Sequence, residues 1–68
     1  MVEARETIER LAAAIAALPL AQREAFLLHH EGDLTAAQIA AATGTNEEAA
    51  KSRLRYAMNK LRDALGDD

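Results

Sequence analysis

The chain has 68 residues, half of them apolar, a net charge of −3 and no cysteine. A chain this short can bury only one small core, so residues 1–68 are expected to form a single domain of modest stability. The lack of cysteine excludes disulfides and thiolate metal sites. The longest apolar run, residues 11–18, is too short and too rich in alanine to span a membrane or to resemble a secretory signal, so we expect a soluble, cytoplasmic domain.

Positive charge is concentrated near the C-terminus. Residues 51–62 carry five lysines or arginines and no acid, whereas the rest of the chain carries three basic residues and all eleven acids. This separation predicts that a phosphate-bearing partner binds the basic segment. Two alternatives remain. One is that the charged face is simply exposed to solvent, as charged helix faces often are, and the other is that it binds another protein and no nucleic acid.

The first half of the chain contains two predicted helices. Apolar residues at helical spacing predict a helix over 4–18, and Pro19 ends it because the residue before a proline is pushed out of the helical region. The second helix is predicted over 20–31. Gly32 is expected to end that helix by taking the left-handed conformation.

A third, short helix is predicted over 35–43. Thr35 and Gln38 fit a capping box, in which each side chain accepts a hydrogen bond from the other residue's backbone N–H. Gly44 is expected to end this helix with a positive φ angle.

The fourth predicted helix, residues 46–65, begins at Asn46, a good N-cap residue. One face of it is apolar and belongs to the predicted core, while the opposite face is polar. The core is expected to contain the large apolar residues of all the helices: Ile8, Leu11, Ile15, Leu18, Leu20, Phe26, Leu27 or Leu28, Leu34, Ile39, Leu54, Met58, Leu61 and Leu65.

A short helix, a glycine turn and a longer basic helix form the pattern of a helix-turn-helix. Ala40 is small enough for the two helices to cross, and Ala50 with Leu54 can anchor the second helix on the body. The predicted fold class is therefore all-α: a four-helix domain with a C-terminal helix-turn-helix, similar to a winged helix but without the wing.

The polar face of the fourth helix carries the side chains that DNA recognition requires. Arg55 can bind a guanine edge through two hydrogen bonds, and Glu48 can accept one from a cytosine amino group. Contacts to phosphates would fix the register without reading the sequence. The further candidates for base or phosphate contacts are Lys51, Ser52, Arg53, Tyr56, Asn59 and, at the start of the third helix, Thr35.

Catalysis and metal binding are not expected. The adjacent His29 and His30 would point about 100° apart on a helix, so they cannot chelate a metal as an i, i+4 pair does. We read them as surface imidazoles. Ser52 has no histidine at helical spacing, and so small a helical body has little room for a catalytic cleft. We therefore expect no enzyme activity, no cofactor and no metal.

Several short motifs resemble region 4 of bacterial sigma factors, most closely those of the extracytoplasmic-function group. The similarity extends from about residue 11 to residue 65. The residues that carry it are Leu18-Pro19, Gln22-Arg23-Glu24, Phe26-Leu27-Leu28, Leu34-Thr35, Ile39-Ala40, Gly44 and Lys51-Ser52-Arg53-Leu54.

This resemblance implies a module whose last helix binds the upstream (minus-35) element of promoter DNA. It also implies docking on the flap of the RNA polymerase β subunit and possible sequestration by an anti-sigma factor. The alternative is an interaction module that binds the flap or an anti-sigma factor with little DNA affinity of its own. The family's region 2 is not found in these residues, so we expect the chain to be the C-terminal domain of a longer sigma factor rather than a free-standing protein.

Carried over by position, Lys51, Ser52, Arg53 and Arg55 match the part of the family's recognition helix that faces DNA. Tyr56 stands where many members have a basic residue, so it would instead stack, hydrogen-bond a phosphate or touch a thymine methyl group. The acidic pair Glu47-Glu48 replaces small or neutral residues, which would lower the affinity or shift the base preference.

Overall fold

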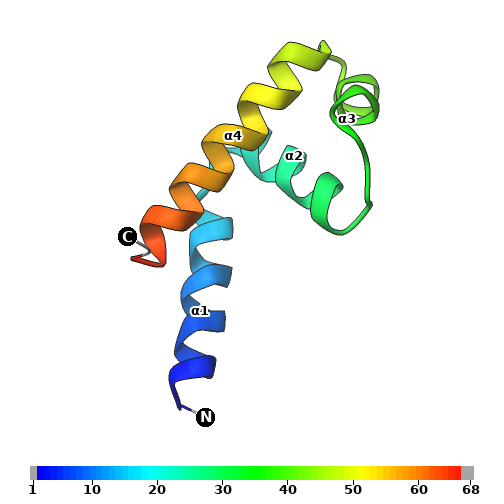
Figure 1. The fold of residues 1–68 in the computed structure, drawn as a ribbon. Coiled ribbons are helices and arrows are strands. Elements are labelled where there is room, and N and C mark those ends of the chain that lie inside the picture. The colour runs from blue at the N-terminus through cyan, green and yellow to red at the C-terminus, as the bar shows by residue number, and fades with distance from the viewer. Residues whose placement is uncertain (1, 67–68) are drawn as a thin grey trace.

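The computed structural model describes residues 2–66, and their side chains from residue 5 onward. It contains four helices, which are α1 (Val2–Ala17), α2 (Leu20–His30), α3 (Ala36–Thr43) and α4 (Glu47–Ala64) (Figure 1). No strand occurs in the described part of the chain, so the predicted all-α fold is confirmed. Each observed boundary lies within two residues of its predicted position.

Helix α4 is the element on which the other three pack. It contacts α1, α2 and α3, and α2 also contacts α3. Figure 1 shows α4 running along the molecule, with α3 beside its N-terminal end and α1 beside its C-terminal end. Helix α2 contributes to both ends of this packing, whereas α3 supports the N-terminal end of α4 and α1 the C-terminal end, so the core is divided into two parts.

The core consists of two clusters in series along α4. The first lies between α1, α2 and the C-terminal half of α4, and its buried residues are Leu18, Phe26, Ala57 and Leu61. The second lies between α2, α3 and the N-terminal half of α4, and its buried residues are Ala25, Ile39, Ala40 and Ala50. Half of these residues are alanines, because a side chain of one methyl group lets two helix backbones approach closely. The prediction from large apolar residues underestimated this contribution.

Three residues predicted to lie in the core are exposed, namely Ile8 (67%), Leu20 (61%) and Met58 (39%). Ile8 belongs to the N-terminal half of α1, and Figure 1 shows this half of the helix extending away from α4, where no other helix covers it. Leu20 is five and six residues before the buried Ala25 and Phe26, which places it on the opposite side of α2. Met58 lies beside the buried stripe of α4, where it lines a groove described below.

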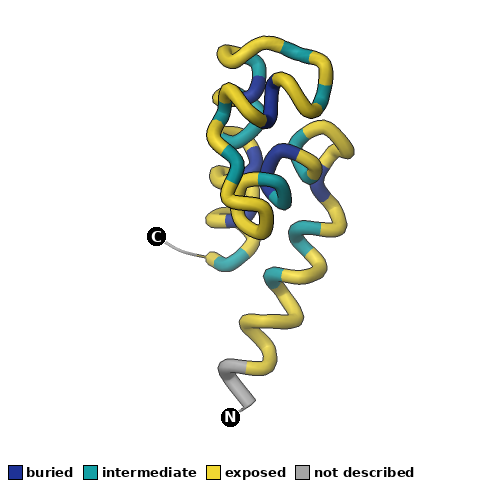
Figure 2. Tube along the Cα trace, turned by 90° about the vertical axis from the view of Figure 1, so that its right-hand side faces the viewer, coloured by how far each residue is buried: buried dark blue, intermediate teal, exposed yellow. Residues whose placement is uncertain are grey.

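The projection of α1 makes the domain elongated. Its principal extents are 40 × 21 × 17 Å and its radius of gyration is 12.8 Å, compared with about 11 Å for a compact domain of this length. Figure 2 shows that residues 5–10 of α1 are exposed along their length. The buried residues are concentrated where α4 meets α2 and α3.

The predicted caps of α3 and α4 are present. The hydroxyl of Thr35 accepts a hydrogen bond from the backbone N–H of Gln38 (3.2 Å), and the Gln38 side chain accepts one from the N–H of Thr35 (2.8 Å). Gly44 ends α3 with a φ of 71°. The side-chain oxygen of Asn46 accepts from the N–H of Ala49 at 2.8 Å, which begins α4.

The predicted role of Gly32 is wrong. The positive φ angle after α2 belongs to Asp33 (56°), not to Gly32. The chain turns at Asp33 so that the N–H of Leu34 can donate to the carbonyl oxygen of Leu28 (3.2 Å). Glycine suits position 32 for a steric reason, since a Cβ there would lie 2.8 Å from that same carbonyl oxygen.

Candidate nucleic-acid interface

The buried face of α4 determines which of its side chains remain available. Ala50 and Ala57 are completely buried and Leu61 almost so, which anchors one side of the helix against both core clusters. Ser52 and Arg53 are half-buried. The predicted DNA-contacting residues of α4 that are exposed are Glu48, Lys51, Arg55, Tyr56 and Asn59.

The turn between α3 and α4 fixes the angle at which α4 is presented. Ile39, which has no exposed surface, packs in the cluster that α3 shares with α4. The N–H of Thr45 donates to the carbonyl oxygen of Ala40 (2.9 Å), so the chain leaves α3 in a defined direction. Thr35 is exposed, and its hydroxyl oxygen accepts the capping hydrogen bond of α3. Its hydroxyl proton is not used in that bond.

Two side chains of the exposed face of α4 already have partners within the helix. The ammonium nitrogen of Lys51 lies 3.5 Å from a carboxylate oxygen of Glu47, one turn earlier. The guanidinium carbon of Arg55 lies 5.5 Å from the centre of the Tyr56 ring. Lys51 is thus partly neutralised at the start of the helix, whereas Arg55 has no ion pair with the residues that the structure describes.

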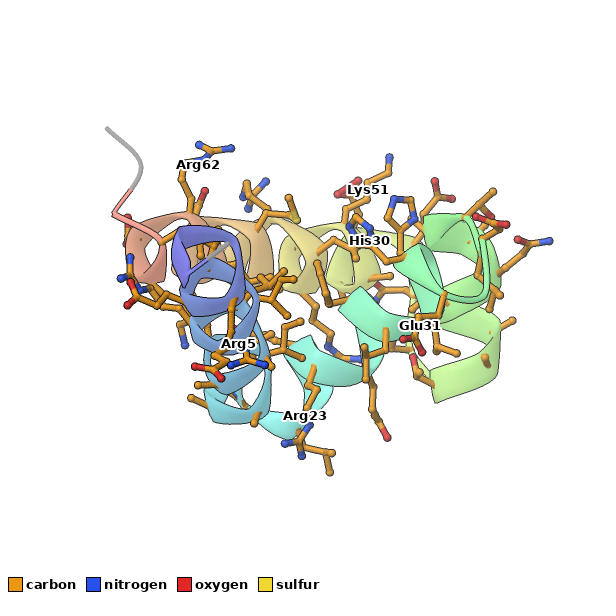
Figure 3. The ribbon with its side chains drawn as sticks, turned by 90° about the horizontal axis from the view of Figure 1, so that it is seen from below. Arg5, Arg23, His30, Glu31, Lys51 and Arg62 are labelled. Atoms are coloured by element: carbon orange, nitrogen blue, oxygen red, sulfur yellow. The ribbon has the colours of Figure 1, made fainter. Side chains whose placement is uncertain are left out.

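Arg23, a basic residue outside α4, does not join this face. Figure 3 shows Lys51 and Arg62 projecting from one side of the molecule, with Arg23 on the opposite side. The guanidinium of Arg23 donates to the carbonyl oxygen of Ala16 at 3.0 Å. That bond satisfies a carbonyl in the last turn of α1 and holds the corner between α1 and α2, so Arg23 has a structural role.

An apolar groove, which the sequence did not reveal, lies at the C-terminal half of α4. It has a volume of about 510 Å³, and its lining residues are Leu11, Phe26, His30, Met58, Leu61, Arg62, Leu65 and Gly66. These residues come from α1, α2 and α4 and the turn after α4, and they are separated by up to 55 positions along the chain. A groove assembled from three helices gives no local pattern in the sequence, which is why Met58 was predicted to lie in the core.

The two histidines are exposed, as predicted, and both have partners within the fold. The Nδ1 atom of His29 lies 3.0 Å from the carbonyl oxygen of Leu34, to which it donates. The ring of His30 packs on that of Phe26, with 4.3 Å between the ring centres. In the described residues no group of three or more histidine, cysteine or carboxylate side chains is placed to hold a metal ion.

The fold and this site define a helix-turn-helix protein, in which a capped short helix supports a longer helix with an exposed polar and basic face. Residues 8–61 match the family described as "Sigma-70, region 4", and the chain belongs to that family. No significant similarity to a curated protein or to a solved structure was found.

Membership in this family makes the chain a DNA-binding domain of a sigma factor that acts in transcription initiation. It is a regulatory domain and not an enzyme, and the family implies interaction with promoter DNA and with RNA polymerase. Within residues 2–66, no helix combines the length and apolar character needed to cross a bilayer.

Proposed function

We propose that this domain recognises the minus-35 promoter element by inserting α4 into the major groove, as part of an extracytoplasmic-function sigma factor in the cytoplasm. The observation that supports this most directly is the division of α4 into two faces. One face consists of the buried residues Ala50, Ala57 and Leu61, and the other carries the exposed residues Glu48, Arg55 and Asn59. In a helix-turn-helix, the outward residues near the start of the second helix reach the base edges.

The proposed contacts differ in what they contribute. Arg55, which has no ion pair with the residues that the structure describes, binds a guanine edge and so carries sequence preference. Glu48 accepts from a cytosine amino group, while Ser52 and Asn59 adapt to the bases that they meet. Lys51, Arg53 and the hydroxyl of Thr35 contact phosphates and fix the register of the helix on the duplex.

Fluorescence anisotropy on a pool of short duplexes, at two salt concentrations, tests this proposal. The wild-type domain should enrich one sequence motif, and its affinity should fall steeply as salt rises because phosphate contacts release counterions. Arg55→Ala should weaken binding to the enriched duplex by about 1–3 kcal/mol and relax the preference at one base pair.

Arg5→Ala is the matched control, since it removes the same charge from an exposed residue near the N-terminus of α1. Figure 1 shows that end of α1 at the other end of the molecule from the start of α4. It should change affinity only slightly and leave the preference unchanged. If no duplex binds above background even at low salt, the proposed role of α4 is wrong for this domain.

The groove beside Met58 supports a second contact, with the β-subunit flap of RNA polymerase. The groove lies at the C-terminal half of α4, whereas the base-reading residues begin at its N-terminal end, so one domain can engage both partners together. An anti-sigma factor would act by covering either surface. The protein-only alternative, with little DNA affinity, is not favoured by the family.

Replacing Met58 with lysine tests the groove. Met58 is partly exposed, so Met58→Lys places a charge at the groove without burying it in the core. In a calorimetric titration with an isolated flap domain, this variant should bind more weakly than wild type by about tenfold or more. Its binding to the enriched duplex should persist. The control Ile8→Lys makes the same kind of change at an exposed apolar residue outside the groove. Equal losses in both variants would contradict this assignment.

A further inference from the structure

Arg55 and Tyr56 form a pair on the exposed face of α4. The guanidinium carbon of Arg55 is 5.5 Å from the centre of the Tyr56 ring, a distance at which a cation is attracted to the face of an aromatic ring. Both residues are exposed, with Tyr56 half accessible to solvent. Arg55 has no ion pair with any residue that the structure describes, so this ring is the partner that restrains its guanidinium.

The position of the pair follows from helix geometry. Successive residues of a helix point about 100° apart, and the direction opposite to the buried face of α4 falls between Arg55 and Tyr56. Ser52 and Asn59 point in this same direction, one turn before and one turn after the pair along the helix. A contact between neighbouring side chains therefore draws the guanidinium of Arg55 across the middle of the outward face.

Lys51 provides a contrast on the same helix. Its ammonium group pairs with a carboxylate of Glu47 (3.5 Å), a contact that a phosphate must replace. The Tyr56 ring carries no charge that neutralises Arg55, and the N–H donors of Arg55 make no hydrogen bond to any residue that the structure describes. The donors at the edge of the guanidinium stay free to meet a guanine in the plane of the base.

We propose that Tyr56 is a positioning residue, which holds Arg55 over the outward face of α4 before DNA arrives. A free arginine side chain loses much rotational freedom when a base fixes it, and restraint in the unbound protein reduces that loss. Tyr56 thus strengthens the base contact of Arg55 without reading a base itself. This inference rests on the proposed function, since it assigns a second residue to the same DNA-reading site.

Three variants separate positioning from direct contact. Tyr56→Leu removes the ring and keeps an apolar helix former, Tyr56→Phe keeps the ring and removes the hydroxyl, and Arg55→Ala removes the restrained group. On the enriched duplex, Tyr56→Leu should bind about two- to fivefold more weakly, the range that an exposed cation–π contact supports. Tyr56→Phe should remain within about twofold of wild type, because the ring face is retained.

The decisive comparison is the double-mutant cycle with Arg55→Ala. If Tyr56 acts through Arg55, Tyr56→Leu should relax preference at the same base pair as Arg55→Ala and should cause no further loss in the Arg55→Ala background. An equal loss in both backgrounds overturns the proposal. So does a loss with Tyr56→Phe as large as with Tyr56→Leu, which would indicate a hydroxyl contact to phosphate.

A measurement without DNA makes the failure of this inference distinguishable from failure of the proposed function. In the NMR spectrum of the free domain, the side-chain methylene protons of Arg55 should be shifted upfield by the Tyr56 ring, and Tyr56→Leu should abolish that shift. Absence of the shift overturns the pairing even if DNA binds well. Presence of the shift in a domain that binds no duplex refutes the proposed function, and with it the role of the pair in reading DNA.

Discussion

Replacing Glu47 with glutamine should lower the stability of the domain and raise its affinity for DNA. Glu47 lies in the first turn of α4, where a negative charge interacts favourably with the helix dipole and stabilises the helix by about 0.3–1 kcal/mol. Its pair with Lys51, one turn later, adds about 0.2–0.5 kcal/mol. Glu47→Gln should therefore reduce the free energy of unfolding by about 0.5–1.5 kcal/mol. The melting temperature should fall by about 4–8 °C for each kcal/mol lost.

The same change should improve DNA binding by about three- to fivefold at low salt. A carboxylate about 8 Å from a phosphate is repelled by about 0.5 kcal/mol in water. Release of Lys51 from an exposed pair adds a contribution of similar size. Because Lys51 can then neutralise a phosphate fully, the slope of log affinity against log salt should become steeper by up to about 0.9.

Thermal unfolding followed by circular dichroism, and anisotropy on the enriched duplex at several salt concentrations, would measure both effects. Glu9→Gln is the control, since it makes the same change in net charge on the exposed face of α1. If Glu9→Gln raises the DNA affinity as much as Glu47→Gln does, the gain is a general effect of net charge. A loss of DNA affinity in Glu47→Gln would refute the reasoning and assign a direct DNA contact to Glu47.

Substitutions at three further positions test the fold, each measured by urea denaturation. Ile39→Ala should cost about 2–5 kcal/mol, because Ile39 is completely buried between α3 and α4; a cost below 1 kcal/mol would contradict this packing. Thr35→Ala should cost about 1 kcal/mol by removing the cap of α3, and Thr35→Ser should restore most of it. Gly32→Ala should cost about 1–3 kcal/mol by crowding the carbonyl oxygen of Leu28, and an unchanged stability would refute the steric role of this glycine.

Features set by local chemistry could be predicted from the sequence. Pro19, the capping box of Thr35 and Gln38, and the αL position of Gly44 each act within a few residues, so the helix boundaries followed from them. The outward face of α4 also followed from helical periodicity, which needs only the direction of the core.

Features that depend on how the helices meet could not be predicted. Periodicity placed Ile8 in an apolar stripe, but only the arrangement of α1 against α4 shows that the stripe continues past the helix on which it packs (Figure 1). The groove beside Met58 and the tertiary bond from Arg23 to Ala16 likewise require the arrangement of the helices. The contact between Arg55 and Tyr56 is local, yet two neighbouring exposed side chains carry no signal of which rotamers bring them together.

The arrangement of two core clusters along one helix has a consequence for engineering and for natural variation. Ile39 and Ala50 support the N-terminal end of α4, where we propose that promoter DNA is read, and Phe26 and Leu61 support the end beside the groove. The two clusters share no buried residue. Substitutions in separate clusters should combine additively when they have no common partner. Under the proposed assignment, a new promoter preference can therefore be selected at the N-terminal end of the helix without changing the groove at its C-terminal half.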